Sequence, residues 1–280
     1  TFLSAIAGAE RVFDVISEPE EAPDRPGAAE LSEASGGAAV EFRDVSFGYR
    51  ADTPVLRRVS FTVPAHTRAA FVGPTGAGKT TIINLLTRFY DVTGGSILVD
   101  GRDLRDYTRD SVRSTFGVVL QETYLFGGTI LDNIRYGRLE ATDEEVREAA
   151  RVAGADRFIT RLRDGYHTRV EDNGGNLSAG QRQLLALARA VLSNPEILIL
   201  DEATSSVDTR TELHIQRIMA ELMRDRTSFV IAHRLGTIRD ADCIFVVEDG
   251  EIVERGDHAE LMAAKGAYHR MYTSQFGMET

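Results

Sequence analysis

The sequence contains one cysteine, Cys243, and no apolar run approaching the ~20 residues that a membrane-spanning helix needs. A single cysteine excludes a disulfide within the chain. Its place in the apolar stretch 243–247 favours a buried structural thiol in a reducing, cytoplasmic setting. A secretory signal is also missing. Basic charge is scarce, since the net charge is -11, and this argues against a nucleic-acid groove, which requires clustered lysine and arginine.

The length of 280 residues is enough for one large domain or two modest ones, each with its own core. Apolar residues at helical spacing in 1–16 predict the end of an amphipathic helix, and a solvated leader helix fits the same pattern. Proline, glycine and acidic residues dominate 17–38 and predict a linker. Because the chain begins in the middle of a pattern, we expect it to be a fragment of a longer protein.

Residues 73–80 match G-x-x-x-x-G-K-[ST] without exception, between an apolar run at 69–72 and a helically spaced segment at 82–90. In such a setting, backbone N–H groups and a helix dipole converge on phosphate oxygens. Glycine removes the Cβ atoms that would block the approach, Lys79 supplies a positive charge, and the Thr80 hydroxyl is the expected Mg²⁺ ligand. The predicted phosphate-binding residues are Gly73, Thr75, Gly76, Ala77, Gly78, Lys79, Thr80 and Thr81.

Two adjacent carboxylates follow the continuously apolar stretch 197–200, which is typical of a strand buried on both faces. Carboxylates at such a position are costly unless they serve a cation or a reaction. Asp201 suits a Mg²⁺ shell, and Glu202 is placed to orient and deprotonate an attacking water. The alternative for Glu202 is a helix-start carboxylate favoured by the dipole. Beside a phosphate loop, the catalytic role is preferred.

Gln121 and His233 each follow a strand-like apolar run, at 116–120 and 229–232. A polar residue directly after a buried strand often lies at the mouth of a ligand crevice in α/β sheets. We therefore expect both side chains to line one crevice.

Two further polar residues stand at predicted helix starts. Ser178 and Gly180 open a long apolar-striped helix and form a second candidate anion site, although an ordinary serine N-cap explains Ser178 equally well. Asp208 is placed to cap the next helix.

These motifs occur in a fixed order along the chain: Tyr49, 73–80, Gln121, Leu-Ser-Ala-Gly-Gln at 177–181, Asp201 with Glu202, 205–208, and His233. In this order they resemble the nucleotide-binding domain of an ATP-binding-cassette transporter of the exporter type, over 39–280. The resemblance implies an α/β fold: a P-loop NTPase core with a mostly parallel sheet, an N-terminal antiparallel β-subdomain and an inserted α-helical subdomain at about 127–194. The leader 1–16 is similar to the cytoplasmic end of the last transmembrane helix.

The resemblance also implies ATP and Mg²⁺ as ligands, with two domains associating head to tail around two ATP molecules and parting on hydrolysis. The implied roles are adenine stacking by Tyr49, Mg²⁺ contacts from Thr80, Gln121 and Asp201, and catalysis by Glu202 with His233 and Gln121. Ser178 and Gly180 would bind the ATP held by the second domain, and Gln181 and Asp208 are further nucleotide-binding residues.

Two partners are implied by the same resemblance, a second nucleotide-binding domain and a transmembrane domain. The second would be contacted near Tyr124, Leu125 and Phe126. From the residues alone, core packing and an exposed partner surface are equal alternatives for this triplet. The chain is expected at the cytoplasmic face of the cell membrane, attached through a transmembrane domain that it does not contain.

Two departures from the family pattern bear on the partner. Ala179 stands where the family has glycine, and 171–176 differs from the usual Gly-Glu-Arg-Gly type of loop. Both changes are similar to one half of heterodimeric bacterial exporters of multidrug or lipid type. Such a half keeps the catalytic glutamate and offers an altered signature to its partner's weaker site. A heterodimer is therefore predicted, with a homodimer as the alternative.

The leading hypothesis is an ATP-hydrolysing motor domain that drives export across a membrane. One alternative is a soluble cassette ATPase that acts in nucleic-acid repair or translation, which the acidic charge and the helical leader oppose. Another is an ATP-dependent dimerisation module with little or no turnover, which the presence of Glu202 opposes.

Overall fold

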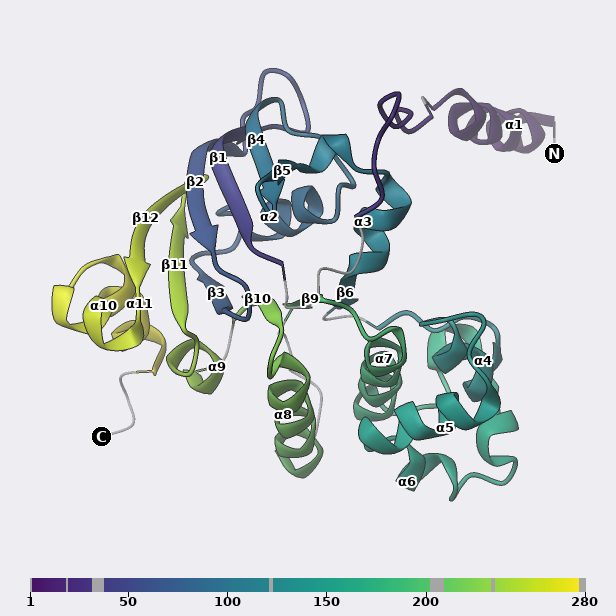
Figure 1. Cartoon of the computed structure of the whole chain (residues 1–280). Coiled ribbons are helices and arrows are strands. Elements are labelled where there is room, and N and C mark those ends of the chain that lie inside the picture. The colour runs from purple at the N-terminus through teal and green to yellow at the C-terminus, as the bar shows by residue number, and fades with distance from the viewer. Residues whose placement is uncertain are drawn as a thin grey trace.

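The computed structural model describes residues 2–18, 20–31, 38–120, 123–201, 209–232 and 235–276. Within these ranges the chain forms two large sheets with a helical arm on one side and two short helices on the other (Figure 1). This architecture confirms the predicted fold class: a mostly parallel sheet, an antiparallel β-subdomain and an inserted helical subdomain.

The larger sheet has the strand order β12-β11-β3-β10-β9-β6. Every neighbouring pair is parallel except β11 with β12, which is antiparallel. All residues of β10 are buried, as expected for a strand covered on both faces. The strands are β3 (Arg68–Val72), β6 (Phe116–Val119), β9 (Ile197–Asp201), β10 (Thr227–Ile231), β11 (Cys243–Glu248) and β12 (Glu251–Gly256).

The smaller, antiparallel sheet packs against the larger one through aromatic rings. Its order is β2-β1-β4-β5, from β1 (Val40–Phe47), β2 (Leu56–Val63), β4 (Gly94–Val99) and β5 (Arg102–Asp103). Phe61 stacks on Phe42 at 4.3 Å between ring centroids and lies 5.5 Å from Phe71 of β3. Apolar residues of α2 (Lys79–Leu86) belong to the same core, so the helix that follows the phosphate loop is buried beside both sheets.

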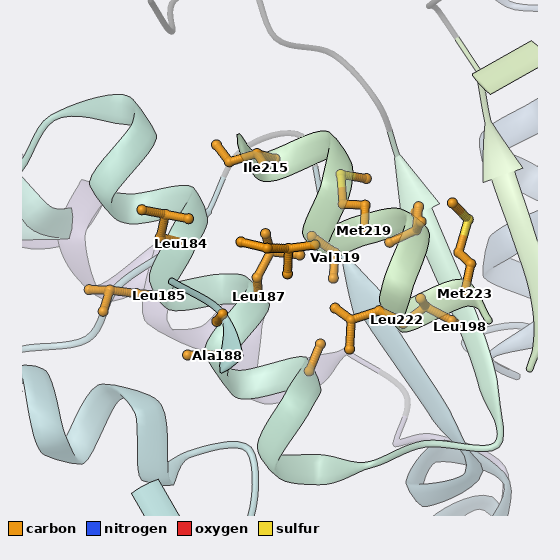
Figure 2. Packing of buried hydrophobic residues seen from close by; sticks show 14 of the residues in the cluster. Val119, Leu184, Leu185, Leu187, Ala188, Leu198, Ile215, Met219, Leu222 and Met223 are labelled. Atoms are coloured by element: carbon orange, nitrogen blue, oxygen red, sulfur yellow. The ribbon is translucent and has the colours of Figure 1, made fainter. Parts of the chain in front are cut away.

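The helical arm runs from β7 (Gly128–Thr129) to α7 (Ala179–Ser193) and includes α4 (Ile130–Arg135), α5 (Asp143–Val152), α6 (Asp156–Ile159) and β8 (Arg169–Val170). A capping box of Thr142 and Glu145 opens α5. Figure 2 shows leucines of α7 packed among apolar side chains of α8 (Thr209–Met223). Val119 of β6 and Leu198 of β9 belong to the same core, which joins the arm to the larger sheet.

The remaining helices are α3 (Arg109–Thr115), α9 (Leu235–Arg239), α10 (His258–Ala264), α11 (Ala267–Phe276) and, at the N-terminal end, α1 (Phe2–Ser17). Figure 1 shows α1 apart from the sheets, and its apolar side chains Phe13 and Ile16 are exposed. Among the described residues, no helix has both the length and the apolar character that a membrane crossing needs.

Three local outcomes refine the sequence analysis. Cys243 opens β11 and is half-buried, and this burial raises the pKa of its thiol, in keeping with a structural role. The triplet 124–126 divides: Leu125 is 1% exposed and belongs to the core, whereas Tyr124 and Phe126 are exposed. Residues 20–31 lie against the domain through hydrogen bonds and ion pairs, although their composition predicts a solvated linker.

Candidate functional site

The phosphate loop lies between the end of β3 and the first turn of α2, as the sequence predicts. At Gly73 the backbone φ is +145°, and a Cβ atom there would lie 2.1 Å from the carbonyl oxygen of Val247 in β11. Gly78 is the N-cap of α2 with φ +107°, a left-handed conformation that favours glycine. Glycine is therefore required at both positions by backbone conformation and close contact.

The Lys79 side chain lies over this loop and is only 6% exposed. Its Nζ donates hydrogen bonds to the carbonyl oxygens of Gly73, at 2.7 Å, and Pro74, at 2.8 Å. Burial lowers the pKa of the Lys79 ammonium, and the carboxylate of Asp201 acts in the opposite direction. An anion bound in the loop would act in the same direction as Asp201, because it stabilises the charged form.

Asp201 is the last residue of β9 and lies at the same end of the sheet as the phosphate loop, because β9 and β3 run in the same direction. In the register, Asp201 pairs with Ile231 of β10, and Ile231 pairs with Phe71 of β3. Thr80, in the first turn of α2, is exposed. Within the described ranges no group of three or more histidine, cysteine or acidic side chains is arranged to hold a metal ion. Mg²⁺ needs none, because it is commonly held by one or two protein oxygens together with substrate phosphates. The hydroxyl of Thr80 and the carboxylate of Asp201 are donors of the kind that Mg²⁺ prefers.

Four predicted site residues, Gln121, Glu202, Asp208 and His233, lie outside the described residues. The strands that precede three of them are described. Since β6, β9 and β10 are adjacent and parallel, their carboxyl ends meet at the edge that carries the phosphate loop. In open α/β sheets, ligands bind in the crevice outside the carboxyl ends of the strands.

Tyr49 lies beyond the end of β1 and is 49% exposed. Its hydroxyl oxygen is 3.2 Å from Thr81 Oγ1 and accepts a hydrogen bond from Asn84 Nδ2 at 3.0 Å. The ring contacts Phe47 and Tyr90 edge to face, each with centroids 5.1 Å apart. The aromatic side chain is thus attached to α2, which begins at the phosphate loop. Asn84 and Tyr90, which contact Tyr49, were not predicted as site residues, because the sequence shows only that they follow the phosphate loop.

The second candidate anion site, at the start of α7, is a capping box. Ser178 Oγ accepts from the Gln181 N–H at 3.2 Å, and Gln181 Oε1 accepts from the Ser178 N–H at 2.9 Å. Ser178 is exposed and Gly180 is buried. Ser178 and Gln181 line a hollow of about 650 Å³ with residues of α6 and α8, and no phosphate-loop residue takes part in it. Within this chain Ser178 is a helix N-cap, and its anion-binding role stays a prediction.

An exposed aromatic patch is formed by Tyr124, Phe126 and Tyr136. The rings of Phe126 and Tyr136 lie 4.6 Å apart, and the guanidinium of Arg189 in α7 lies within 6 Å of both. Arg189 also donates to the carbonyl oxygen of Tyr124 at 2.7 Å and to that of Asn133 at 2.6 Å. The patch is therefore attached to α7 through Arg189, although its rings are open to solvent.

Comparison with known proteins gives a consistent result. A family model described as ABC transporter matches residues 56–205, more than half of the chain. The fatty acid ABC transporter ATP-binding/permease protein of Mycobacterium tuberculosis is 58% identical over 268 residues, which cover 96% of this chain and 42% of that protein. The ATP-dependent lipid A-core flippase of Syntrophus aciditrophicus is 49% identical over 276 residues, which cover 99% of this chain and 45% of that protein.

Among solved structures, a bacterial Atm1-family ABC exporter with ATP bound matches with a TM-score of 0.88 and 42% identity. The match covers 99% of this chain and 48% of that chain. The chain therefore spans less than half the length of each of these relatives.

Proposed function

The chain belongs to the ABC transporter family, and from this premise we propose that it is the ATP-hydrolysing motor domain of an exporter. The proposal rests on the position of Asp201, which lies near Lys79 and the phosphate loop at the carboxyl ends of the parallel strands in the larger sheet. The whole transporter would be attached to the membrane, with this domain on the cytoplasmic face.

In the proposed reaction, the γ-phosphate of ATP is transferred to water. The loop N–H groups and Lys79 bind the phosphates, and Thr80, Asp201 and Gln121 would hold Mg²⁺. When bound, the ion would neutralise part of the charge on the phosphates. Glu202 orients the attacking water and accepts its proton, and His233 contacts the γ-phosphate.

Tyr49 is proposed to stack on adenine. Tyr49→Ala is expected to weaken ATP binding by about 1–3 kcal/mol, the usual range for base stacking on an aromatic side chain. Tyr49→Phe keeps the ring and loses only the hydroxyl contacts with Thr81 and Asn84, so its effect should be smaller. Calorimetric titrations with Mg-ATP and with Mg-tripolyphosphate measure both effects. Equal losses for the two ligands would contradict stacking, because tripolyphosphate has no base.

ATP binding to Ser178, Gly180 and Gln181 is proposed to occur between two domains. In this chain Ser178 is exposed at the start of α7 and lines a hollow apart from the phosphate loop. The helix α7 has 15 residues, and its N-terminus is suited to bind a phosphate that another domain presents. Asp208 is proposed to act at the same interface. The two domains would then sandwich two ATP molecules in a head-to-tail arrangement.

Ala179 is proposed to weaken this interface, which favours a heterodimer. In a Glu202→Gln background, which blocks hydrolysis, the chain is expected to remain largely monomeric with Mg-ATP. Adding Ala179→Gly should then increase the dimer fraction, because it removes the methyl group at the first residue of α7. Size-exclusion chromatography with light scattering measures both. If Glu202→Gln alone dimerises fully, the signature is competent and a homodimer is the better interpretation.

The membrane-domain contact is proposed to be the aromatic patch of Tyr124, Phe126 and Tyr136. Leu125, which the sequence analysis included in this contact, is left out because its side chain is buried. α1 is proposed to be the cytoplasmic end of the last transmembrane helix, because its apolar side chains have no partner surface within the described residues. Two of the relatives are named for fatty acid and for lipid A-core, and these names favour a lipid as the transported substrate.

The proposed function is tested by phosphate release from Mg-ATP by this chain, alone and mixed with candidate partner domains. Release that requires Mg²⁺ and is abolished by Glu202→Gln supports a motor domain. Nucleotide binding without release under every condition would favour the silent dimerisation module. Tight binding of DNA or RNA at moderate salt would favour a soluble cassette ATPase.

A further inference from the structure

Residues 20–31, here called the strap, connect α1 with the domain and are bound to it by backbone hydrogen bonds. The N–H of Ala29 donates to the carbonyl oxygen of Asp106 at 2.9 Å, and the N–H of Thr108 donates to that of Ala29 at 2.8 Å. The N–H of Leu31 donates to Ser111 Oγ at 2.9 Å. The strap therefore extends along the segment that leads into α3.

A cluster of charges holds the other half of the strap. Asp24 Oδ1 lies 3.3 Å from Arg88 Nη1 and 3.4 Å from Arg109 Nη1, and Asp24 also accepts from the Arg109 N–H. Glu21 pairs with Arg109 and Arg113, and this contact with Arg113 lowers the pKa of the Glu21 carboxyl. Asp91 also pairs with Arg88 and Arg109, so two nearly buried guanidiniums share carboxylates from the strap and from the domain.

Arg88 lies just beyond the end of α2, whose C-cap is Thr87. Its side chain is 3% exposed, and its backbone has φ +53°, an unusual left-handed conformation for a long side chain. It donates to the carbonyl oxygen of Tyr107 at 2.5 Å, and Arg113 donates to the carbonyl oxygen of Arg88 at 3.1 Å. A strained backbone persists only where its surroundings fix it. Here the surroundings include Asp24.

We infer that Asp24 links attachment of the strap to nucleotide occupancy of the phosphate loop, acting through Arg88. The helix α2 has eight residues, with Lys79 at its first position and Arg88 two residues past its last. Without Asp24, Asp91 is the remaining carboxylate for Arg88, and a buried charge that loses a partner is strongly destabilised. Arg88 would move toward water and shift the end of α2.

This link gives α1 a connection to the nucleotide site that does not pass through the aromatic patch. Asp24 is a positioning residue in this scheme, since it contacts Arg88 and not the nucleotide. The nucleotide half of the inference rests on the proposed function, whereas attachment of the strap by Asp24 does not. The linkage is reciprocal: the factor by which strap release weakens nucleotide binding equals the factor by which nucleotide strengthens strap attachment.

The test combines two measurements on the chain and on Asp24→Asn. Amide hydrogen exchange, read by mass spectrometry on peptides that span 20–31, reports strap attachment without and with Mg-AMP-PNP. Calorimetry reports the affinity for the same ligand. We expect Asp24→Asn to lose at least about tenfold in strap protection and several-fold in affinity, which is within the usual range of coupling between sites. In the unmodified chain, Mg-AMP-PNP should slow exchange in the strap. Asp24→Glu should restore part of both effects.

The matched control is Arg25→Gln. Arg25 is the next residue in the strap and also forms an ion pair with the domain, with Asp106, but this pair is exposed and should contribute little. Should Asp24→Asn fail to fold, Ala29→Pro loosens the strap by removing one backbone donor without changing any charge. A strap that stays protected in Asp24→Asn overturns the attachment. A strap that is released while affinity and the ligand response are unchanged overturns the linkage. Absence of nucleotide binding by the unmodified chain contradicts the proposed function and the linkage, and leaves the attachment result standing.

Discussion

Replacing Lys79 by methionine is expected to lower phosphate release from Mg-ATP by about 10²–10³-fold, the usual effect of removing one preorganised electrostatic group from a transition state. Methionine keeps much of the buried aliphatic length and removes the ammonium, so the fold around the 6%-exposed side chain should persist. The ammonium donates hydrogen bonds to the carbonyl oxygens of Gly73 and Pro74 in the phosphate loop, so the charge that Lys79→Met removes lies at the loop itself. Steady-state phosphate release, with calorimetry for affinity, measures the loss.

Lys265 is the only other lysine in the sequence and provides the matched control. It caps the C-terminus of α10 and is exposed, so Lys265→Met should retain the turnover of the unmodified chain. Wild-type turnover in Lys79→Met would contradict the role of the phosphate loop. Equal losses in both variants would indicate a general effect of lost charge.

Glu202→Gln is expected to lower phosphate release by ~10²–10⁴-fold, the usual contribution of general base catalysis, while ATP affinity changes little. The amide cannot accept the proton of the attacking water, although it is nearly the same size as the carboxylate. This pattern distinguishes Glu202 from Lys79, because Lys79→Met should weaken binding as well as turnover.

Glu251→Gln is the control for Glu202→Gln, since Glu251 is an exposed carboxylate at the start of β12. It should release phosphate like the unmodified chain. If Glu202→Gln retained full turnover, Glu202 would be the helix-start carboxylate that the sequence analysis considered as the alternative.

The parts of the site that could be predicted from the sequence are those in which local chemistry determines the structure. The glycines at 73 and 78 are required by positive φ angles or by contact with Val247, and Thr142 caps α5 through a residue three positions away. Buried parallel strands were recognised from uninterrupted apolar runs such as 197–200, because both faces of these strands are covered.

Features that depend on long-range contacts could not be predicted. Asp24 contacts Arg88 and Arg109, which are 64 and 85 positions away. Contacts over such separations leave no local pattern, so the composition of 17–38 indicates only a solvated linker. The triplet 124–126 was too short to show a period, and only the fold shows that Leu125 points into the core while its two neighbours do not. Gln121, Glu202 and His233 remain predictions about roles after described strands, and Asp208 remains a prediction at the start of a helix.

The most direct test of the account is a calorimetric titration of the unmodified chain with Mg-ATP, repeated with Lys79→Met. The account predicts saturable binding at one site per chain, weakened by loss of Mg²⁺ and more strongly by Lys79→Met. Absence of ATP binding, or binding that Lys79→Met leaves unchanged, would contradict the assignment of residues 73–80 as the nucleotide site.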